Sequence, residues 1–182
     1  DGPIFGRIGF VETVEAALNH PHYKTPLQGP NRGRGVASGF WFNGAGQSSV
    51  TAILNSDGKI HLVEGTTDIS GTRTSAAMML AETLGIPAED INPEVVDTDS
   101  IGMTGGTGGS SVTHKIGITT NKVGLKLIDE LTSRLADRWE TDAAAISYDN
   151  ATFSANGDSM SFKEAAAELS KDGPIMVSYA EN

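Results

Sequence analysis

Two stretches of small residues carry the chemistry that this sequence offers. Gly102–Ser111 consists almost entirely of Gly, Ser and Thr, and Gly65–Thr74, which comes first along the chain, is a stretch of similar character. Each stands between a predicted strand and a predicted helix. Glycine lets a backbone approach a ligand closely, and a helix start offers unpaired N–H donors and the positive end of its dipole. Because such loops suit phosphate or another anion, we expect the two to converge on one extended, phosphorylated ligand.

Composition restricts the classes of function. The chain has 182 residues and no Cys, which excludes disulfides, thiolate nucleophiles and Cys-ligated zinc or iron–sulfur sites on this chain. Its formal net charge of −10 repels nucleic acid and anionic membranes, so a bound phosphate must be held by local donors. No apolar run approaches the roughly 20 residues of a membrane span, and no signal peptide is visible. We therefore expect a cytoplasmic protein that neither spans a membrane nor binds nucleic acid.

The first 34 residues predict an irregular lead-in with one short helix. Val11–Asn19 has the apolar spacing of a helix that ends at His20-Pro21. The Pro and Gly residues that follow are typical of an irregular segment. His20 and His22 flank a proline, where such a pair is more often incidental than a metal site. We expect residues 1–34 to precede a single domain at 35–182.

Alternating apolar residues predict a sheet in that domain. Residues 35–43 and 49–55 are expected to pair as a hairpin, and 59–64 to complete an antiparallel meander. The remaining predicted strands are 91–97, 146–148, 152–153 and 175–179.

Helical spacing predicts two principal helices and a shorter one. The first spans Thr72–Leu84 and ends at a glycine. The longest begins after the second glycine-rich stretch, and its Gly117 and Gly124, seven residues apart, would let it lie close to a neighbour. Ser161–Glu164 has the sequence of a capping box that opens a helix over Phe162–Leu169. The predicted fold class is α+β, a mainly antiparallel or mixed sheet with two principal helices.

The order of the motifs along the chain resembles that of a known family. The motifs are Gly35 to Gly46, Asn55–Gly58, Glu64–Thr66, Gly71–Thr74, Ala81–Pro87, Asp97–Asp99 and Gly108–Ser110. Together they resemble the molybdenum-binding subunit of the xanthine dehydrogenase and aldehyde oxidase family, and more narrowly its C-terminal molybdopterin-binding region. The resemblance therefore implies a molybdopterin-binding-domain-like fold.

The resemblance also implies an activity, a cofactor and partners. Enzymes of this family hydroxylate an aldehyde or an N-heterocycle with oxygen from water, at a molybdenum ion carried by a molybdopterin dinucleotide. Electrons leave through iron–sulfur clusters to FAD or another acceptor. The implied partners are the remaining part of the molybdenum subunit and the iron–sulfur and FAD subunits or domains.

Four cofactor contacts are implied in the first glycine-rich stretch. Residues 69–71 stand where the family has a Gly-Gln-Gly loop, so Gly71 is kept and Ser70 replaces the amide side chain. Thr72 and Arg73 follow at the helix start. Arg73 is the cation best placed to meet a phosphate, although an Arg on a solvated face is an equally good reading.

Four further contacts are implied in the second stretch. Gly108, Gly109 and Ser110 match the family's loop beside the molybdenum centre and the pterin, and Thr113 matches a polar contact in the next turn. Pterin and pyrophosphate need short donors and a close backbone. We expect Gly109→Val to abolish cofactor incorporation in the complete enzyme with little effect on folding.

Two motifs of the family have no counterpart in this sequence. One is the Gly-Glu motif that carries the catalytic glutamate, and the other is the Gly-rich motif with Phe of the preceding domain. We therefore expect no catalytic residue and no metal ligand here. The chain would be a fragment or one piece of a split subunit, and would bind the cofactor poorly and catalyse nothing alone.

Two alternatives stay open. A structural or interaction module derived from this fold would keep the loops without holding a pterin, and Ser70 in place of the amide favours it. A phosphate- or nucleotide-binding domain unrelated to molybdenum would use the same backbone donors. Asp97 and Asp99 suggest an acid–base pair or a cation site, but carboxylates at a strand end more often cap backbone N–H groups.

Overall fold

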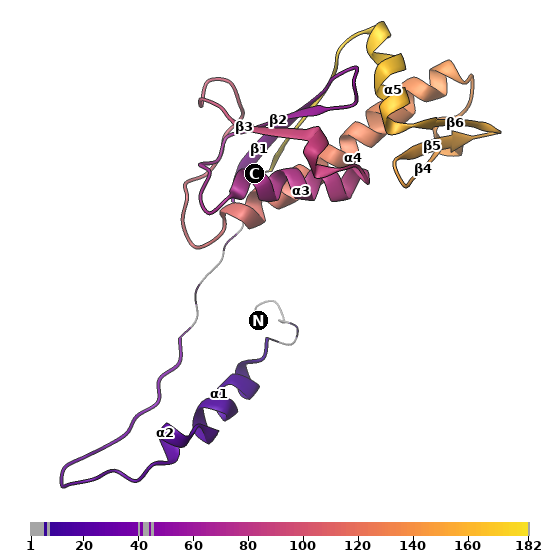
Figure 1. Cartoon of the computed structure of the whole chain (residues 1–182). Helices are drawn as coiled ribbons and strands as arrows, with labels where there is room; N and C mark the ends of the chain where they lie inside the picture. Colours follow the sequence, from indigo (N-terminus) through magenta and orange to yellow (C-terminus); the bar gives the residue numbers. More distant parts are fainter. Residues whose placement is uncertain (1–5, 7, 40, 42–43, 45, 182) are drawn as a thin grey trace, which may run out of the picture. The chain divides into compact units, whose positions relative to one another are not determined.

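The computed structural model describes residues 6, 8–39, 41, 44 and 46–181, which belong to two units, 1–40 and 41–182 (Figure 1). The first unit contains α1 (Phe10–Asn19) and α2 (Pro21–Lys24), and neither helix has a buried residue. His20 accepts a hydrogen bond from the His22 N–H on Nδ1 at 3.2 Å and thereby caps α2. None of the described helices is long and apolar enough to cross a membrane.

The second unit combines helices with two sheets, as the predicted α+β class requires (Figure 1). Its strands are β1 (Ser48–Leu54), β2 (Ile60–Glu64), β3 (Ile91–Val95), β4 (Ser147–Asp149), β5 (Thr152–Ala155), β6 (Asp158–Ser161) and β7 (Ile175–Glu181). Its α-helices are α3 (Thr72–Leu84), α4 (Val112–Arg138) and α5 (Phe162–Leu169). The larger sheet is mixed, in the order β3-β2-β1-β7, and the smaller is antiparallel, in the order β4-β5-β6.

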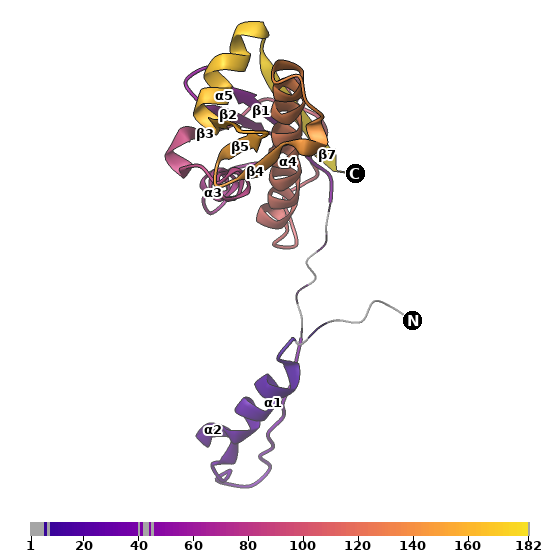
Figure 2. The same ribbon diagram turned by 90° about the vertical axis from the view of Figure 1, so that its right-hand side faces the viewer.

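The core lies between the larger sheet and the helices α3 and α4 (Figures 1 and 2). Alternate residues of β1 and β2, among them Ala52 and Leu62, are fully buried on the face toward the helices. A Cβ added at Gly117 would lie 2.7 Å from Met79 Sδ, and one at Gly124 would lie 2.8 Å from Thr83 Cγ2. The two glycines therefore let α4 lie close to α3, as predicted.

The connection from β2 through α3 to β3 makes two neighbouring strands parallel. Their register pairs Ile60 with Ile91 and Glu64 with Val95, so both strands end at the same edge of the sheet. β3 contains Pro93, which removes a ladder donor and suits a strand at the sheet edge. The two glycine-rich stretches, which follow β2 and β3, therefore leave the sheet side by side.

The strand predicted over 35–43 is wrong. Its described residues, 35–39 and 41, are irregular, and its other residues lie outside the described part of the chain. The place beside β1 is taken by β7, which pairs antiparallel in continuous register from Ser48↔Glu181 to Leu54↔Ile175. The predicted hairpin between 49–55 and 59–64 is confirmed as β1–β2, whereas the pairing with 35–43 is replaced by a strand from the other end of the chain.

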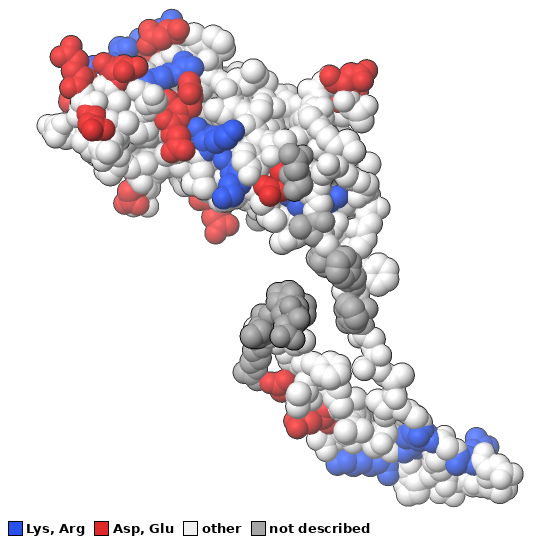
Figure 3. Space-filling view, turned by 180° about the vertical axis from the view of Figure 1, so that it is seen from behind, with Lys and Arg blue, Asp and Glu red and all other residues white. Residues whose placement is uncertain are grey.

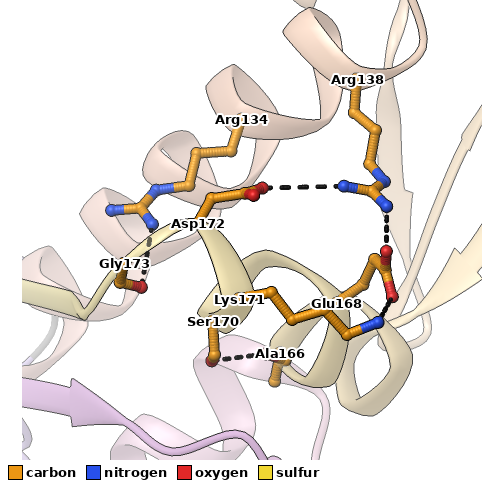
Figure 4. A network of polar contacts seen from close by, with 8 residues as sticks. All are labelled: Arg134, Arg138, Ala166, Glu168, Ser170, Lys171, Asp172 and Gly173. Atoms are coloured by element: carbon orange, nitrogen blue, oxygen red, sulfur yellow. Dashed lines mark hydrogen bonds and ion pairs between the residues drawn. The ribbon is translucent and has the colours of Figure 1, made fainter.

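The C-terminal end of α4 is held to the segment after α5 by charged side chains (Figure 4). Arg138 forms ion pairs with Glu168 and, at 3.6 Å, with Asp172, and Lys171 forms an ion pair with Glu168. Arg134 donates a hydrogen bond to the Pro174 carbonyl at 3.0 Å, just before β7. Acidic and basic side chains lie intermingled toward this end of the unit (Figure 3). These contacts fix the direction in which β7 enters the sheet.

Candidate functional site

The two loops that follow β2 and β3 contact each other. We call residues 65–71 the first glycine loop and residues 102–111 the second glycine loop. The hydroxyl oxygens of Thr67 and Thr107 lie 3.0 Å apart. A Cβ added at Gly65 would lie 2.7 Å from the hydroxyl oxygen of Thr104, so only glycine lets the loops approach this closely. The predicted convergence of the loops is therefore present in the fold.

Both loops reach their helices through the same backbone conformation. Ser70 and Gly71 have φ angles of 54° and 78° immediately before α3. Gly109 and Ser110 have φ angles of 61° and 55° before Ser111, the residue that precedes α4. A left-handed Ser costs roughly 1–2 kcal/mol relative to Gly, so each loop stores some strain in exchange for a sharp entry into its helix. Each loop, which the sequence predicts between a strand and a helix, thus enters its helix after two consecutive left-handed residues.

A shared cleft of about 400 Å³ lies between the loops and the start of α4. It is lined by Ile69, Ser70, Thr107, Gly108, Ser110, Val112 and Thr113. The lining includes four of the eight residues predicted from the sequence. Short hydroxyl side chains make up the polar part, and Ile69 and Val112 supply apolar surface. Such a wall suits a ligand that combines a flat ring with anionic groups.

The start of α3 is already occupied by a carboxylate of its own loop. Asp68 accepts hydrogen bonds from the Arg73 backbone N–H at 3.1 Å and from Arg73 Nε at 2.9 Å. These bonds, the backbone one first, hold the pKa of Asp68 below its usual value. Thr72 is buried and donates its hydroxyl proton to the Ile69 carbonyl at 2.6 Å. Arg73 and Thr72 therefore face the loop rather than line the cleft, and this helix start carries a negative group.

The start of α4 has no such partner. The N–H groups of Val112, Thr113 and His114 have no acceptor among the described residues. Ser111 does not cap the helix, because its hydroxyl donates to the Gly108 carbonyl at 2.8 Å. The backbone N–H groups of residues 106–110 are likewise without an acceptor in the described structure. The second loop and α4 thus present a run of free donors beside the cleft, whereas at the start of α3 the Arg73 N–H is engaged by Asp68.

The second glycine loop is fastened to the rest of the unit by contacts that the sequence analysis did not identify. Gly105 N–H donates to the Gln47 carbonyl at 2.8 Å, and Ser49 Oγ donates to the Gly102 carbonyl at 2.6 Å. Lys115 Nζ donates to the Gly105 and Gly106 carbonyls at 3.2 and 3.0 Å. Lys115 is only 4% exposed. The burial of Lys115 could have been predicted from the sequence, because helical spacing places it on the same face of α4 as the buried Val112, Ile116 and Thr119.

Glu64, at the end of β2, is fully buried beneath the first loop. Burial raises the pKa of its carboxyl to about 7, against a weaker opposing effect of the Thr66 hydroxyl. Thr66 donates to Oε2 at 3.4 Å, and Oε1 has no partner among the described residues. Strand alternation places Glu64 on the inward face with Ile60 and Leu62, which is the pattern that marks it as buried in the sequence.

Asp97 accepts hydrogen bonds from the turn that follows it. Its Oδ1 accepts the Asp99 backbone N–H at 2.9 Å, and hydrogen bonds from Ser100 and from that N–H lower its pKa. Among the described residues there is no cluster of three or more His, Cys, Asp or Glu side chains that would hold a metal ion. The described donors beside the cleft are therefore backbone N–H groups and hydroxyls.

A comparison with protein families places the chain. The family described as molybdopterin cofactor-binding domain matches residues 15–180. The match covers nearly the whole chain, including the sheet, both glycine loops and α3 and α4. The chain belongs to this family, as the resemblance of its motifs indicated. No match was found among curated proteins.

Solved structures share the fold. The Cu,Mo-containing CO dehydrogenase in its carbon monoxide-reduced state superposes with a TM-score of 0.67 at 24% identity, over 74% of this chain and 18% of that one. A reconstituted CO dehydrogenase from Oligotropha carboxidovorans gives 0.64 at 23% identity, over 74% and 18%. Quinoline 2-oxidoreductase from Pseudomonas putida 86 gives 0.54 at 15% identity, over 75% and 19%. The present chain thus spans less than a fifth of the length of these proteins.

Proposed function

We propose that this chain is a cofactor-binding segment of a molybdenum hydroxylase and that its cleft holds part of a molybdopterin dinucleotide. The observation that carries the proposal is the cleft shared by Ser70, Gly108 and Ser110, with free N–H donors of the second loop beside it. These donors suit the oxygens of a pyrophosphate and the polar edge of a pterin. The small side chains let the backbone come within hydrogen-bond distance of the ligand.

Individual residues have separate tasks in this proposal. The N–H groups of Val112 and Thr113, at the positive end of the α4 dipole, would hold an anionic oxygen. The hydroxyls of Ser70 and Ser110, on opposite loops of the cleft, would orient the ligand from two sides. When bound, the molybdenum–pterin group would supply the oxidative hydroxylation of an aldehyde or N-heterocycle with oxygen from water. This chain would not catalyse alone, and the rest of the molybdenum subunit with iron–sulfur and FAD partners would complete the enzyme.

One observation favours a second candidate function. Ser70 replaces the amide that the resembled family has in the first loop, and the α3 start is filled by Asp68. A module that keeps the fold for interaction alone would tolerate both features. It would not need the free donors of the second loop, which is why cofactor binding remains the better supported function.

Titration of the purified chain tests the proposal. We expect the chain alone to bind weakly, but to bind molybdopterin dinucleotide at least about tenfold more tightly than ATP, GTP or inorganic pyrophosphate, because the dinucleotide offers both a pterin for the cleft wall and a pyrophosphate for the donors. Each tenfold step corresponds to about 1.4 kcal/mol. Isothermal titration calorimetry measures the ratio. Equal or tighter binding of a simple nucleotide would support an unrelated nucleotide-binding domain, and no binding of any probe would support the interaction module.

A glycine variant serves as a control that tests whether the ligand binds in the cleft. Gly108→Val places a branched side chain beside the cleft, and a Cβ at Gly108 meets no atom within 4 Å. It should weaken dinucleotide binding at least about tenfold with an unchanged urea midpoint. Gly109→Val is unsuitable, because the φ of +61° at Gly109 is strained for Val. The expectation that Gly109→Val leaves folding intact is therefore replaced by a predicted loss of stability.

A further inference from the structure

Lys115 is a buried ammonium without a carboxylate partner. It lies in the first turn of α4, is 4% exposed, and forms no ion pair within the described structure. Its hydrogen-bond acceptors are the carbonyl oxygens of Gly105 and Gly106. Burying an ammonium costs several kcal/mol unless its donors are satisfied. Two of its three N–H donors have acceptors, and the hydrogen bonds of its ammonium all go to the second glycine loop.

The geometry of the peptide group says what those contacts do. In a planar trans peptide the C=O and the N–H point in opposite directions. The Gly105 carbonyl shares its peptide group with the Gly106 N–H, and the Gly106 carbonyl shares its peptide group with the Thr107 N–H. Because Lys115 holds both carbonyls toward its own ammonium, both N–H groups are turned away from it. Neither N–H has an acceptor among the described residues.

We propose that Lys115 is a positioning residue of the cofactor loop, which holds two peptide groups so that the Gly106 and Thr107 N–H groups face an anionic group of the ligand. The inference rests on the proposed function. Thr107 lines the cleft, so one of these two N–H groups belongs to a residue of its wall. The lysine charge also polarises both peptide groups, which makes their N–H groups better donors, and offsets the charge of a bound anion.

The surroundings of Lys115 fit this task. A Cβ added at Gly46 would lie 3.2 Å from Lys115 Cδ, so the stem of the lysine occupies space beside a glycine. Gly105 N–H is held by the Gln47 carbonyl at 2.8 Å, on the other side of the same residue. The peptide groups around Gly105 are therefore fixed from two directions. Lys115 supplies the one contact that carries a charge.

The test compares Lys115→Met with Lys115→Arg and with a matched control, Lys126→Met. Lys126 lies on the same helix and donates to a backbone carbonyl, that of Ser178, at 3.1 Å, rather than to a carbonyl of the second glycine loop. Removing it changes the net charge by the same amount. Met keeps the length and apolar volume of the lysine stem, and urea unfolding of each variant shows that it is folded.

Two measurements are made on the full 182-residue chain. Amide hydrogen exchange of Gly105 reports the order of the loop without any ligand, with Ala52 in the core as internal reference. Calorimetric titration with inorganic pyrophosphate and with molybdopterin dinucleotide reports binding. We expect Lys115→Met to speed Gly105 exchange at least tenfold and to weaken binding of both probes at least tenfold. Lys115→Arg should restore part of both effects, and Lys126→Met should leave both at the wild-type level.

Each of the other outcomes contradicts one step of the proposal. If the amide exchange rate of Gly105 is unchanged in Lys115→Met, Lys115 does not order the second glycine loop. Faster exchange with unchanged binding, in a wild-type chain that binds, would overturn the positioning role. Equal losses in Lys126→Met would reduce the effect to net charge. If the wild-type chain binds neither probe, the proposed function fails and the ligand part of this inference fails with it, whereas the exchange of Gly105 still decides whether Lys115 orders the loop.

Discussion

At the residue scale, the cleft depends on small side chains in both glycine loops and on the buried Lys115, which donates to two carbonyls of the second loop. Small residues beside a helix start mark a loop that a ligand can approach, and the resemblance of the motifs to those of the family implies Ser70, Gly108, Ser110 and Thr113, which all line the cleft. Lys115 was missed because a lysine in the first turn of a helix is usually exposed. Its burial depends on Gly105 and Gly106, which fold back over it.

Arg73 has a partner in its own loop that the sequence analysis did not consider. A cation at a helix start suggested a phosphate contact, but Asp68, five residues earlier, binds both its backbone N–H and its side chain. The sequence contains both residues, and only the turn of the first loop decides that they meet. A local carboxylate that can reach the helix start is therefore the competing partner to consider when an Arg is assigned to a ligand.

Glu64 gives a prediction of pH dependence. Its folded-state pKa of about 7 lies above the ordinary carboxyl value of 4.5, so between these values the folded chain holds a proton that the unfolded chain has released. Stability from this group is complete at and below pH 4.5 and is lost as the pH rises toward 7. In urea unfolding, we expect the wild type to lose about 2–3 kcal/mol relative to Glu64→Gln between pH 4.5 and pH 7.5. A stability difference that stays constant over this range would show that Glu64 does not titrate in this way.

At the scale of elements, the close contact of α3 and α4 makes a direct prediction. A side chain at Gly124 would meet Thr83 Cγ2 at 2.8 Å and Leu80 Cδ1 at 3.0 Å, so the helices must separate to accept one. Gly124→Leu should lower the free energy of unfolding by about 1–3 kcal/mol or more. The same side chain at the exposed neighbour, Lys122→Leu, should change it by less than about 0.5 kcal/mol. Equal effects in urea unfolding would mean that the packing at Gly124 is not limiting.

Local sequence patterns correctly predict α3, α5 and the first hairpin. The capping box at Ser161–Glu164 forms as predicted, with α5 over Phe162–Leu169, and α3 occupies the predicted Thr72–Leu84. The partner of β1 could not be read locally, because Ser48–Leu54 pairs with Ile175–Glu181, more than a hundred residues away. Alternation in 35–43 looks the same as in a true strand, and the competition for the edge of β1 is decided by tertiary structure. β6 was missed because Asp158–Ser161 has no apolar alternation.

At the scale of the whole molecule, the chain has the fold of its family but a small share of the length of the solved proteins it resembles. It covers 18–19% of those chains, and the described helices of its first unit bury no residue. The proposed function therefore assigns this chain one wall of a cofactor site. Under this proposal, the substrate site and the path of the electrons would belong to other parts of the enzyme.

The central claim is that both glycine loops contact one ligand. Amide chemical-shift mapping of the ¹⁵N-labelled chain with molybdopterin dinucleotide tests it most directly. We predict that the shifted amides fall in residues 66–71 and 106–114 together, at one saturation midpoint, with those of β4, β5 and β6 unmoved. Shifts confined to one loop, two separate midpoints, or a response centred away from both loops would contradict the account.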